Sequence, residues 1–224
     1  STIILFIWGV ILSAVSEITE RFELTRKYSL PVLLASVPTF ALGLITGFAY
    51  GTPLGLLAAF GVAVIYAGLH FLRVRWWLWT TALLSFIIAY FAFFNLELIQ
   101  KWNVFFGYQT LFLSLLFLLP DLFLKKDLTA DKEWRWPPRI YGVVFTLYTS
   151  LILLVQNEST HAVICFGVYA LFFAAYTLAQ RKAILGYLPA VYLPLSIIYA
   201  LHHFNVDAWL PTLTALAVLY FVIG

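Results

Sequence analysis

Charged residues are scarce in this sequence, and this scarcity decides the solvent in which the chain folds. Only 10% of the 224 residues are charged, whereas 63% are hydrophobic. A soluble domain carries about 25% charged residues, so no aqueous fold can bury this excess of apolar surface. The composition therefore predicts an integral membrane protein. The net charge of +3 is too small to indicate nucleic-acid binding.

Cysteine and methionine are nearly absent as well. The single cysteine, Cys165, excludes an internal disulfide framework and a metal site built from cysteines. The sequence contains no Met, and its first apolar run lacks the basic flank and the cleavage site of a signal peptide. The last apolar run, residues 209–224, is shorter than the ~20 residues that a spanning helix needs. We therefore expect the sequence to be a fragment of a longer chain.

Long apolar runs, by contrast, make up most of the chain, and short polar segments separate nine of them. They cover residues 1–16, 29–50, 53–72, 76–95, 104–124, 139–155, 160–179, 183–202 and 209–224. Most match the ~17–25 residues with which a helix crosses a bilayer. The short segments of alternating polarity that form membrane β-barrels are absent from the sequence. We predict an all-α, polytopic transmembrane helical bundle of eight to nine spans, arranged as antiparallel hairpins in a single transmembrane domain, 1–224.

Basic residues alternate along these runs. Twelve of the 13 Lys and Arg residues lie in every second connection, and Lys101 is the exception. The four basic connections are residues 17–28, 73–76, 125–139 and 180–183. The positive-inside rule places such loops in the cytoplasm, here on the inner side of what we expect to be a bacterial cytoplasmic membrane.

The stretch "HFLRVRWWLWT", residues 70–80, is the cytoplasmic turn of a helical hairpin in this scheme. Arg73, Arg75, Trp76 and Trp77 are then interfacial anchors, because Trp rings and long Arg side chains favour headgroup depth. Binding of a substrate by the two arginines is the alternative, and the sequence leaves it open.

An internal repeat is also visible. "FGVAVIYAGLHFLRVRW" at 60–76 aligns with "FGVYALFFAAYTLAQRK" at 166–182, an offset of 106 residues that corresponds to four spans. An even number of spans gives both copies the same orientation, so the prediction is a parallel four-helix repeat with units near 53–102 and 160–208. Chance resemblance between apolar helices, and a shorter hairpin unit, stay open as alternatives.

The middle of every predicted span after residue 29 lacks Asp, Glu, Lys and Arg. Proton relays, ion sites and voltage sensors need ionisable groups at that depth, so the sequence gives no sign of these functions. Asp121 comes closest, near the inner end of the fifth span. We expect Glu17 and Glu20 to be interfacial charges near Arg21.

Three glycines recur every four residues in "GLITGFAYG". On a helix, Gly43, Gly47 and Gly51 share one face, which lets another backbone approach closely. We predict a helix-packing role for them, either inside this bundle or against a partner subunit.

Four polar residues gather on the predicted outer side: His161, His202, His203 and Asp207. A helical turn puts His203 and Asp207 on one face, within reach of a metal or a phosphate group. No fixed-spacing metal or catalytic motif accompanies them. We therefore predict no metal site and no catalytic residue, and keep this outer-face cluster as a candidate.

His70, beside the basic turn, raises the question of pigment or haem. The sequence places no paired His at a facing mid-span position. We expect an interfacial histidine with a water or backbone partner. No cofactor is predicted beyond bound lipid, and pigment or haem binding is the most distant alternative.

Hairpin repeats, basic inner turns and phrases such as "LGYLPAVYLPLSIIYALHHFNVDAWLPTLTALAVLYFVIG" (185–224) occur together here. This combination resembles large, poorly characterised bacterial polytopic membrane proteins built of tandem transmembrane hairpins. The resemblance covers most of the chain, implies a piece of a longer polytopic protein, and carries no catalytic residues over.

These features favour a non-catalytic integral membrane subunit or scaffold that packs against lipids and other membrane protein subunits. The alternative is a carrier or enzyme for a lipidic or isoprenoid substrate, with aromatic walls and the outer-face cluster as its polar site.

Overall fold

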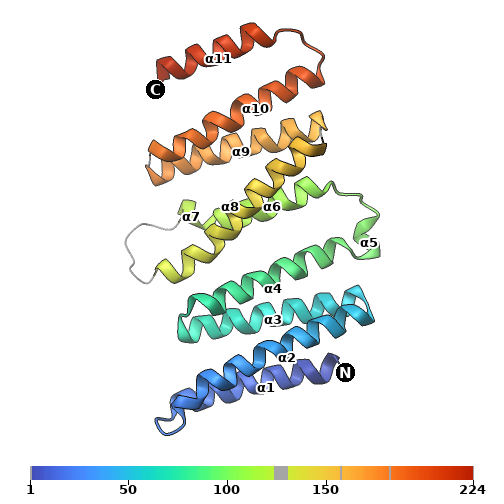
Figure 1. Ribbon diagram of the computed structural model, residues 1–224, viewed down its shortest axis with the longest axis vertical. Helices are drawn as coiled ribbons and strands as arrows, with labels where there is room; N and C mark the ends of the chain where they lie inside the picture. The colour runs from blue at the N-terminus through green and yellow to red at the C-terminus, as the bar shows by residue number, and fades with distance from the viewer. Residues whose placement is uncertain (1, 124–130, 157, 182, 224) are drawn as a thin grey trace. The chain divides into compact units, whose positions relative to one another are not determined.

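The computed structural model describes residues 2–123, 131–156, 158–181 and 183–223, and within these ranges every regular element is helical (Figure 1). Among the described residues, eight helices are long and apolar enough to cross a membrane. The prediction of an all-α, polytopic helical bundle is confirmed, and the chain is an integral membrane protein. The ninth predicted span corresponds to a shorter apolar helix, whose apolar part covers Leu210–Tyr220.

The chain divides into two compact units, Ser1–Asn103 and Val104–Gly224, called unit 1 and unit 2 below. The helices of unit 1 are α1 (Thr2–Arg21), α2 (Ser29–Tyr50), α3 (Thr52–Arg73), α4 (Trp76–Phe94) and the short α5 (Glu97–Gln100). Within this unit α1 packs on α2, α2 on α3, and α3 on α4. Consecutive helices are joined by short connections, so each pair forms an antiparallel hairpin (Figure 1).

Two backbone conformations make the tight turns of unit 1. Gly51 has a φ of 140° between α2 and α3, a region open to glycine but strained for other residues. Pro53 lies in the first turn of α3, where its fixed φ suits the helix. Val74 has a φ of 40° and ends α3 by donating from its N–H to the carbonyl of His70 at 2.7 Å.

The described regular elements of unit 2 are helices too. Its helices are α6 (Phe106–Leu118), α7 (Pro120–Phe123), α8 (Asp131–Gln156), α9 (Ser159–Gln180), α10 (Tyr187–His203) and α11 (Trp209–Ile223). The main packing pairs are α6 with α8 and α9 with α10. Arg181 ends α9 with a φ of 50°, and its backbone N–H donates a hydrogen bond of 2.8 Å to the carbonyl of Thr177. Val74 ends α3 with the same conformation and the same type of hydrogen bond.

Side-chain polarity in α1 is inverted relative to a soluble amphipathic helix. Its buried residues are Thr2, Gly9, Ser13 and Ser16, and its exposed ones include Ile3, Ile4, Ile7 and Trp8. In water such an arrangement would expose the apolar side chains and bury the polar ones, whereas in lipid it places small residues where helices touch. The packing of this helix therefore agrees with a lipid environment.

The core of each unit lies between its paired helices. In unit 1 the buried apolar residues are Leu33, Phe40, Val62, Tyr66, Leu69, Leu78 and Ala82. In unit 2 they are Leu111, Leu118, Leu153, Ala162, Cys165, Phe166, Tyr169, Ala170, Phe173 and Tyr192.

The described parts of the two aligned segments, 60–76 and 166–181, fall on the third long helix of each unit, α3 and α9, and on the residues that directly follow it. Duplication itself stays a prediction.

Candidate functional site

Arg73, at the end of α3, forms an ion pair with the last turns of α1. Its Nε lies 2.9 Å from Glu17 Oε2, and its Nη1 lies 3.8 Å from Glu20 Oε2. Its Nη2 also donates to the backbone carbonyl of Ser16 at 2.6 Å. The Arg73 side chain is only 6% exposed, so one buried guanidinium joins α3 to α1 through two hydrogen bonds and a longer ionic contact with Glu20.

The sequence did not indicate this pairing, because 56 residues separate Arg73 from Glu17. Two features of the sequence could have indicated it. The alternation of basic connections placed Arg73 and Glu17 on the same predicted side of the membrane, and Glu17 and Glu20 lie about one helical turn apart in α1. The predicted neighbour of these acids, Arg21, is present but looser: its Nε lies 3.8 Å from Glu17, and its side chain is 71% exposed.

The turn after α3 holds the remaining predicted anchors. His70 is fully buried, donates from Nδ1 to the carbonyl of Arg75 at 2.8 Å, and stacks on Trp79 with ring centroids 5.6 Å apart. This backbone partner is the kind expected for an interfacial histidine. Trp76 is 60% exposed and Trp77 is half-buried. The anchor role of these side chains stays a prediction.

The three glycines do not share one face. Gly43 and Gly47 are buried in α2, and a Cβ on Gly47 would lie 3.3 Å from the Cα of Gly55 in α3. Gly51 lies outside the helix, in the turn before α3, because α2 ends at Tyr50. Gly47 therefore lies close to the backbone of α3, and its role in helix packing, like that of Gly43, stays a prediction. For Gly51 the helix-packing prediction is wrong, because its backbone leaves the helical region.

Asp121 is the centre of a second ion-pair cluster, at the end of unit 2 where α7 meets α8 and α9. The carboxylate is nearly buried and accepts hydrogen bonds from the Arg139 guanidinium and, at 3.0 Å, from the Tyr176 hydroxyl. Gln180, at the end of α9, donates from its side-chain amide to the Asp121 carbonyl at 2.6 Å. This acid near the inner end of the fifth predicted span is therefore paired within its own unit.

His161 is at the centre of a polar chain at the opposite end of unit 2. Its Nδ1 lies 2.8 Å from the Tyr108 hydroxyl, and its Nε2 lies 3.1 Å from a carboxylate oxygen of Glu158. The Phe105 ring stacks on the imidazole, with centroids 4.2 Å apart. When Glu158 accepts from Nε2, the neutral ring leaves Nδ1 to accept the Tyr108 proton. This carboxylate–imidazole–hydroxyl order is the one that general-base sites use.

The other members of the predicted outer-face cluster do not join His161. The Nδ1 of His203 contacts the hydroxyls of Ser159 and Thr160 at 3.3 and 3.2 Å, and His202 and Asp207 are exposed. The shared face expected for His203 and Asp207 is wrong, because α10 ends at His203 and Asn205 turns the backbone with a φ of 52°. Among the described residues no group of three His, Cys, Asp or Glu side chains is placed to hold a metal.

Hydroxyl groups join the helices in the interior of both units. The Tyr66 hydroxyl lies 3.0 Å from Ser36 in unit 1. In unit 2 the corresponding contacts are Ser114 to Tyr169 at 2.8 Å, Thr149 to Thr110 at 2.8 Å, and Ser150 to Tyr192 at 3.2 Å. Such interhelical bonds stabilise helix association in lipid.

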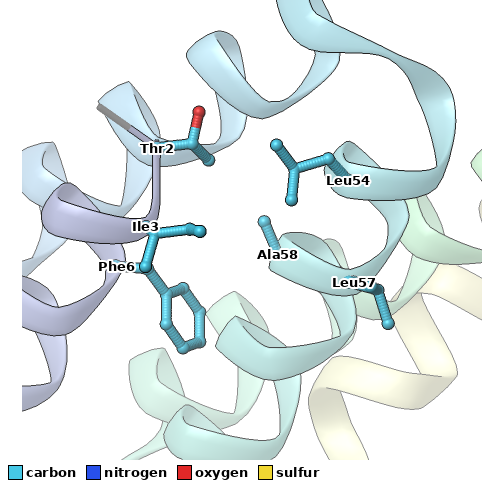
Figure 2. A pocket seen from close by; sticks show the side chains of 6 residues that line it. All are labelled: Thr2, Ile3, Phe6, Leu54, Leu57 and Ala58. Atoms are coloured by element: carbon cyan, nitrogen blue, oxygen red, sulfur yellow. The ribbon is translucent and has the colours of Figure 1, made fainter.

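An apolar groove opens between α1 and α3 of unit 1, at the end opposite Arg73. Its volume is about 160 Å³, and its walls are Thr2, Ile3 and Phe6 from α1 and Leu54, Leu57 and Ala58 from α3. Figure 2 shows Thr2 and Ile3 of α1 facing Leu54 and Ala58 of α3 across the groove. The Thr2 hydroxyl is already bonded to Thr46 at 3.0 Å, so the groove presents mainly hydrocarbon.

Comparison of the chain with family models, with curated proteins and with solved structures finds no match.

Proposed function

We propose that this protein is a non-catalytic membrane subunit or scaffold, whose helices pack against lipids and against other membrane protein subunits. The observation that carries the proposal is the outward face of the helices. Large apolar side chains point away from both units, such as Leu57 at 68% exposed in α3 and Leu171 at 76% exposed in α9. Lipid tails or apolar helices are the partners that suit this surface.

The placement of charge supports the same proposal. In the eight described spans every Asp, Glu, Lys and Arg lies within six residues of a span end. Glu17 and Asp121 have arginine partners within their own units. Transport of an ion or a proton needs charged groups in mid-membrane, and the middle of each described span holds no Asp, Glu, Lys or Arg.

Bound lipid belongs to this proposal. The groove between α1 and α3 is apolar and narrow, and a lipid acyl chain has the matching shape and polarity. Lipid in this groove would contact Phe6 and Leu57, and it would fill the space between two helices that Figure 2 shows facing each other.

Photocrosslinking in native membranes tests the scaffold proposal. A benzophenone amino acid at Leu57 or Leu171 should give adducts with lipid or with a second membrane protein chain. The same amino acid at Leu153, which is 1% exposed, should crosslink only within the chain. If the exposed positions give no more external adducts than position 153, the outward faces are not contact surfaces and the proposal fails.

The Glu158–His161–Tyr108 chain favours a second candidate function, an enzyme acting on a lipidic substrate at this end of unit 2. The geometry suits proton transfer to or from the Tyr108 hydroxyl. Purified protein incubated with a bacterial lipid extract tests this candidate by mass spectrometry of the lipids. An enzyme loses turnover in His161→Gln and keeps it in His202→Ala, whereas a scaffold shows no turnover in any variant.

A further inference from the structure

The connection between α1 and α2 carries exposed basic side chains that can bind an anion from outside the unit. Together with the α3–α4 turn it forms what is called here the basic end of unit 1, residues 16–29 and 70–76. This end holds five basic residues, Arg21, Arg26, Lys27, Arg73 and Arg75, and three acidic ones, Glu17, Glu20 and Glu23. The excess of positive charge raises the question of which anion it meets.

Two of the acidic residues, Glu17 and Glu20, have partners inside the unit. Arg73 approaches both carboxylates from its buried position, at 2.9 Å for Glu17 and 3.8 Å for Glu20. The Ser29 hydroxyl donates a further hydrogen bond to Glu20. The buried guanidinium therefore balances one of these two negative charges, and the four other basic residues at this end exceed the remaining acidic charge by two.

The exposed arginines pair with the same acids only loosely. Arg21 lies 3.8 Å from Glu17 and Arg26 lies 3.4 Å from Glu20, with side chains 71% and 70% exposed. Exposed pairs at such distances contribute little and leave the guanidinium open to a second anion. Lys27 is exposed too, with its Nζ 5.0 Å from the centre of the Tyr28 ring.

Apolar side chains project from the same connection. Phe22 is 61% exposed, Leu24 is 90% exposed and Tyr28 is 54% exposed, and Trp76 of the neighbouring turn is 60% exposed. Water disfavours such a set, whereas the boundary between headgroups and acyl chains accepts apolar and cationic side chains together. The surface therefore fits a membrane interface better than an aqueous partner.

We propose that the basic end of unit 1 binds anionic phospholipids. Arg21, Arg26 and Lys27 contact the lipid phosphate groups, and Phe22 and Leu24 lie among the first acyl carbons. Zwitterionic lipids carry a compensating cation on each headgroup, so the surface prefers phosphatidylglycerol to phosphatidylcholine. The inference rests on the membrane location in the proposed function, and it adds a lipid class and a site.

Native mass spectrometry of the detergent-solubilised full chain tests the proposal, with titrations of phosphatidylglycerol and of phosphatidylcholine. The wild type should bind phosphatidylglycerol more tightly. The Arg26→Gln/Lys27→Gln double variant should lose about 25-fold in that affinity, on the basis of about fivefold for each cation near an anionic lipid. Its affinity for phosphatidylcholine should not change.

Two control variants test whether the effect depends on the position and on the charge of the replaced residues. Lys101→Gln removes an exposed cation beyond α5, at the opposite end of unit 1, and should leave the preference intact. The charge-conserving Arg26→Lys/Lys27→Arg variant should also keep it. Equal wild-type affinities for the two lipids, or an unchanged preference in the double variant, would overturn the proposal.

Carbonate extraction of the membranes from which the chain is purified separates this proposal from the proposed function. If the chain resists carbonate extraction from membranes but shows no lipid preference, the lipid site fails and the membrane subunit stands. If carbonate releases the chain, the proposed function fails with it.

Discussion

The Nε of Arg73 lies 2.9 Å from a carboxylate oxygen of Glu17, although the two residues are 56 positions apart. This contact joins the last turn of α3 to the last turns of α1. In a helical membrane protein the hydrophobic effect does not drive one helix against another, so specific polar contacts of this kind help to decide which helices meet.

Loss of the Arg73 side chain should destabilise unit 1. Removing one partner of a buried ion pair leaves an uncompensated charge, so we expect Arg73→Gln to lower the free energy of unfolding by about 3 kcal/mol. Reversible unfolding in mixed micelles measures this change. Arg21→Gln removes only an exposed pair and should cost less than about 0.5 kcal/mol. Equal effects of the two variants would show that burial of Arg73 contributes nothing.

Asp121 should have a comparable role in unit 2. We expect Asp121→Ala to cost about 3 kcal/mol, because it leaves the Arg139 guanidinium without its carboxylate. Tyr176→Phe removes one of the hydrogen bonds to the same carboxylate and should cost about 1 kcal/mol. The unfolding measurement used for Arg73 applies here. A larger loss in the Tyr176 variant would contradict the assignment of the ion pair as the main contact.

Two glycines of unit 1 provide a matched test of helix packing. A Cβ at Gly47 would lie 3.3 Å from the backbone of Gly55, whereas a Cβ at Gly68 would meet nothing within 4 Å. We expect Gly47→Ala to destabilise the unit by about 1–3 kcal/mol through overpacking. Gly68→Ala should be neutral, or stabilising by up to about 1 kcal/mol through helix propensity. Thermal unfolding of the two variants side by side gives the answer, and the reverse order would rule out the close approach of α2 and α3.

The spans were predictable because their signal is local. A run of apolar residues of the right length indicates a spanning helix whatever the rest of the chain does. Helix ends were less accurate: the first predicted run ends at residue 16, whereas α1 continues to Arg21. The acids that closed the run in the sequence are accommodated within the helix because Arg73 lies beside them.

The candidate sites were less predictable, since they depend on contacts between distant segments. His161 was identified, but its partners Tyr108 and Glu158 were not joined to it, because Tyr108 lies on another helix. The shared face expected for His203 and Asp207 depended on a continuous helix. The helix instead ends at His203, and Asn205 adopts a left-handed conformation.

The orientation of the connections is the central expectation that a single labelling experiment can test. Leu24 in the α1–α2 connection is 90% exposed, Trp102 after α5 is 73% exposed, and the native Cys165 is fully buried. Leu24→Cys and Trp102→Cys therefore place reactive thiols at opposite ends of unit 1 with little background. In intact bacterial cells a membrane-impermeant maleimide should label position 102 and leave position 24 unlabelled until the cells are lysed. Labelling of position 24 in intact cells, or of both positions alike, would contradict the account.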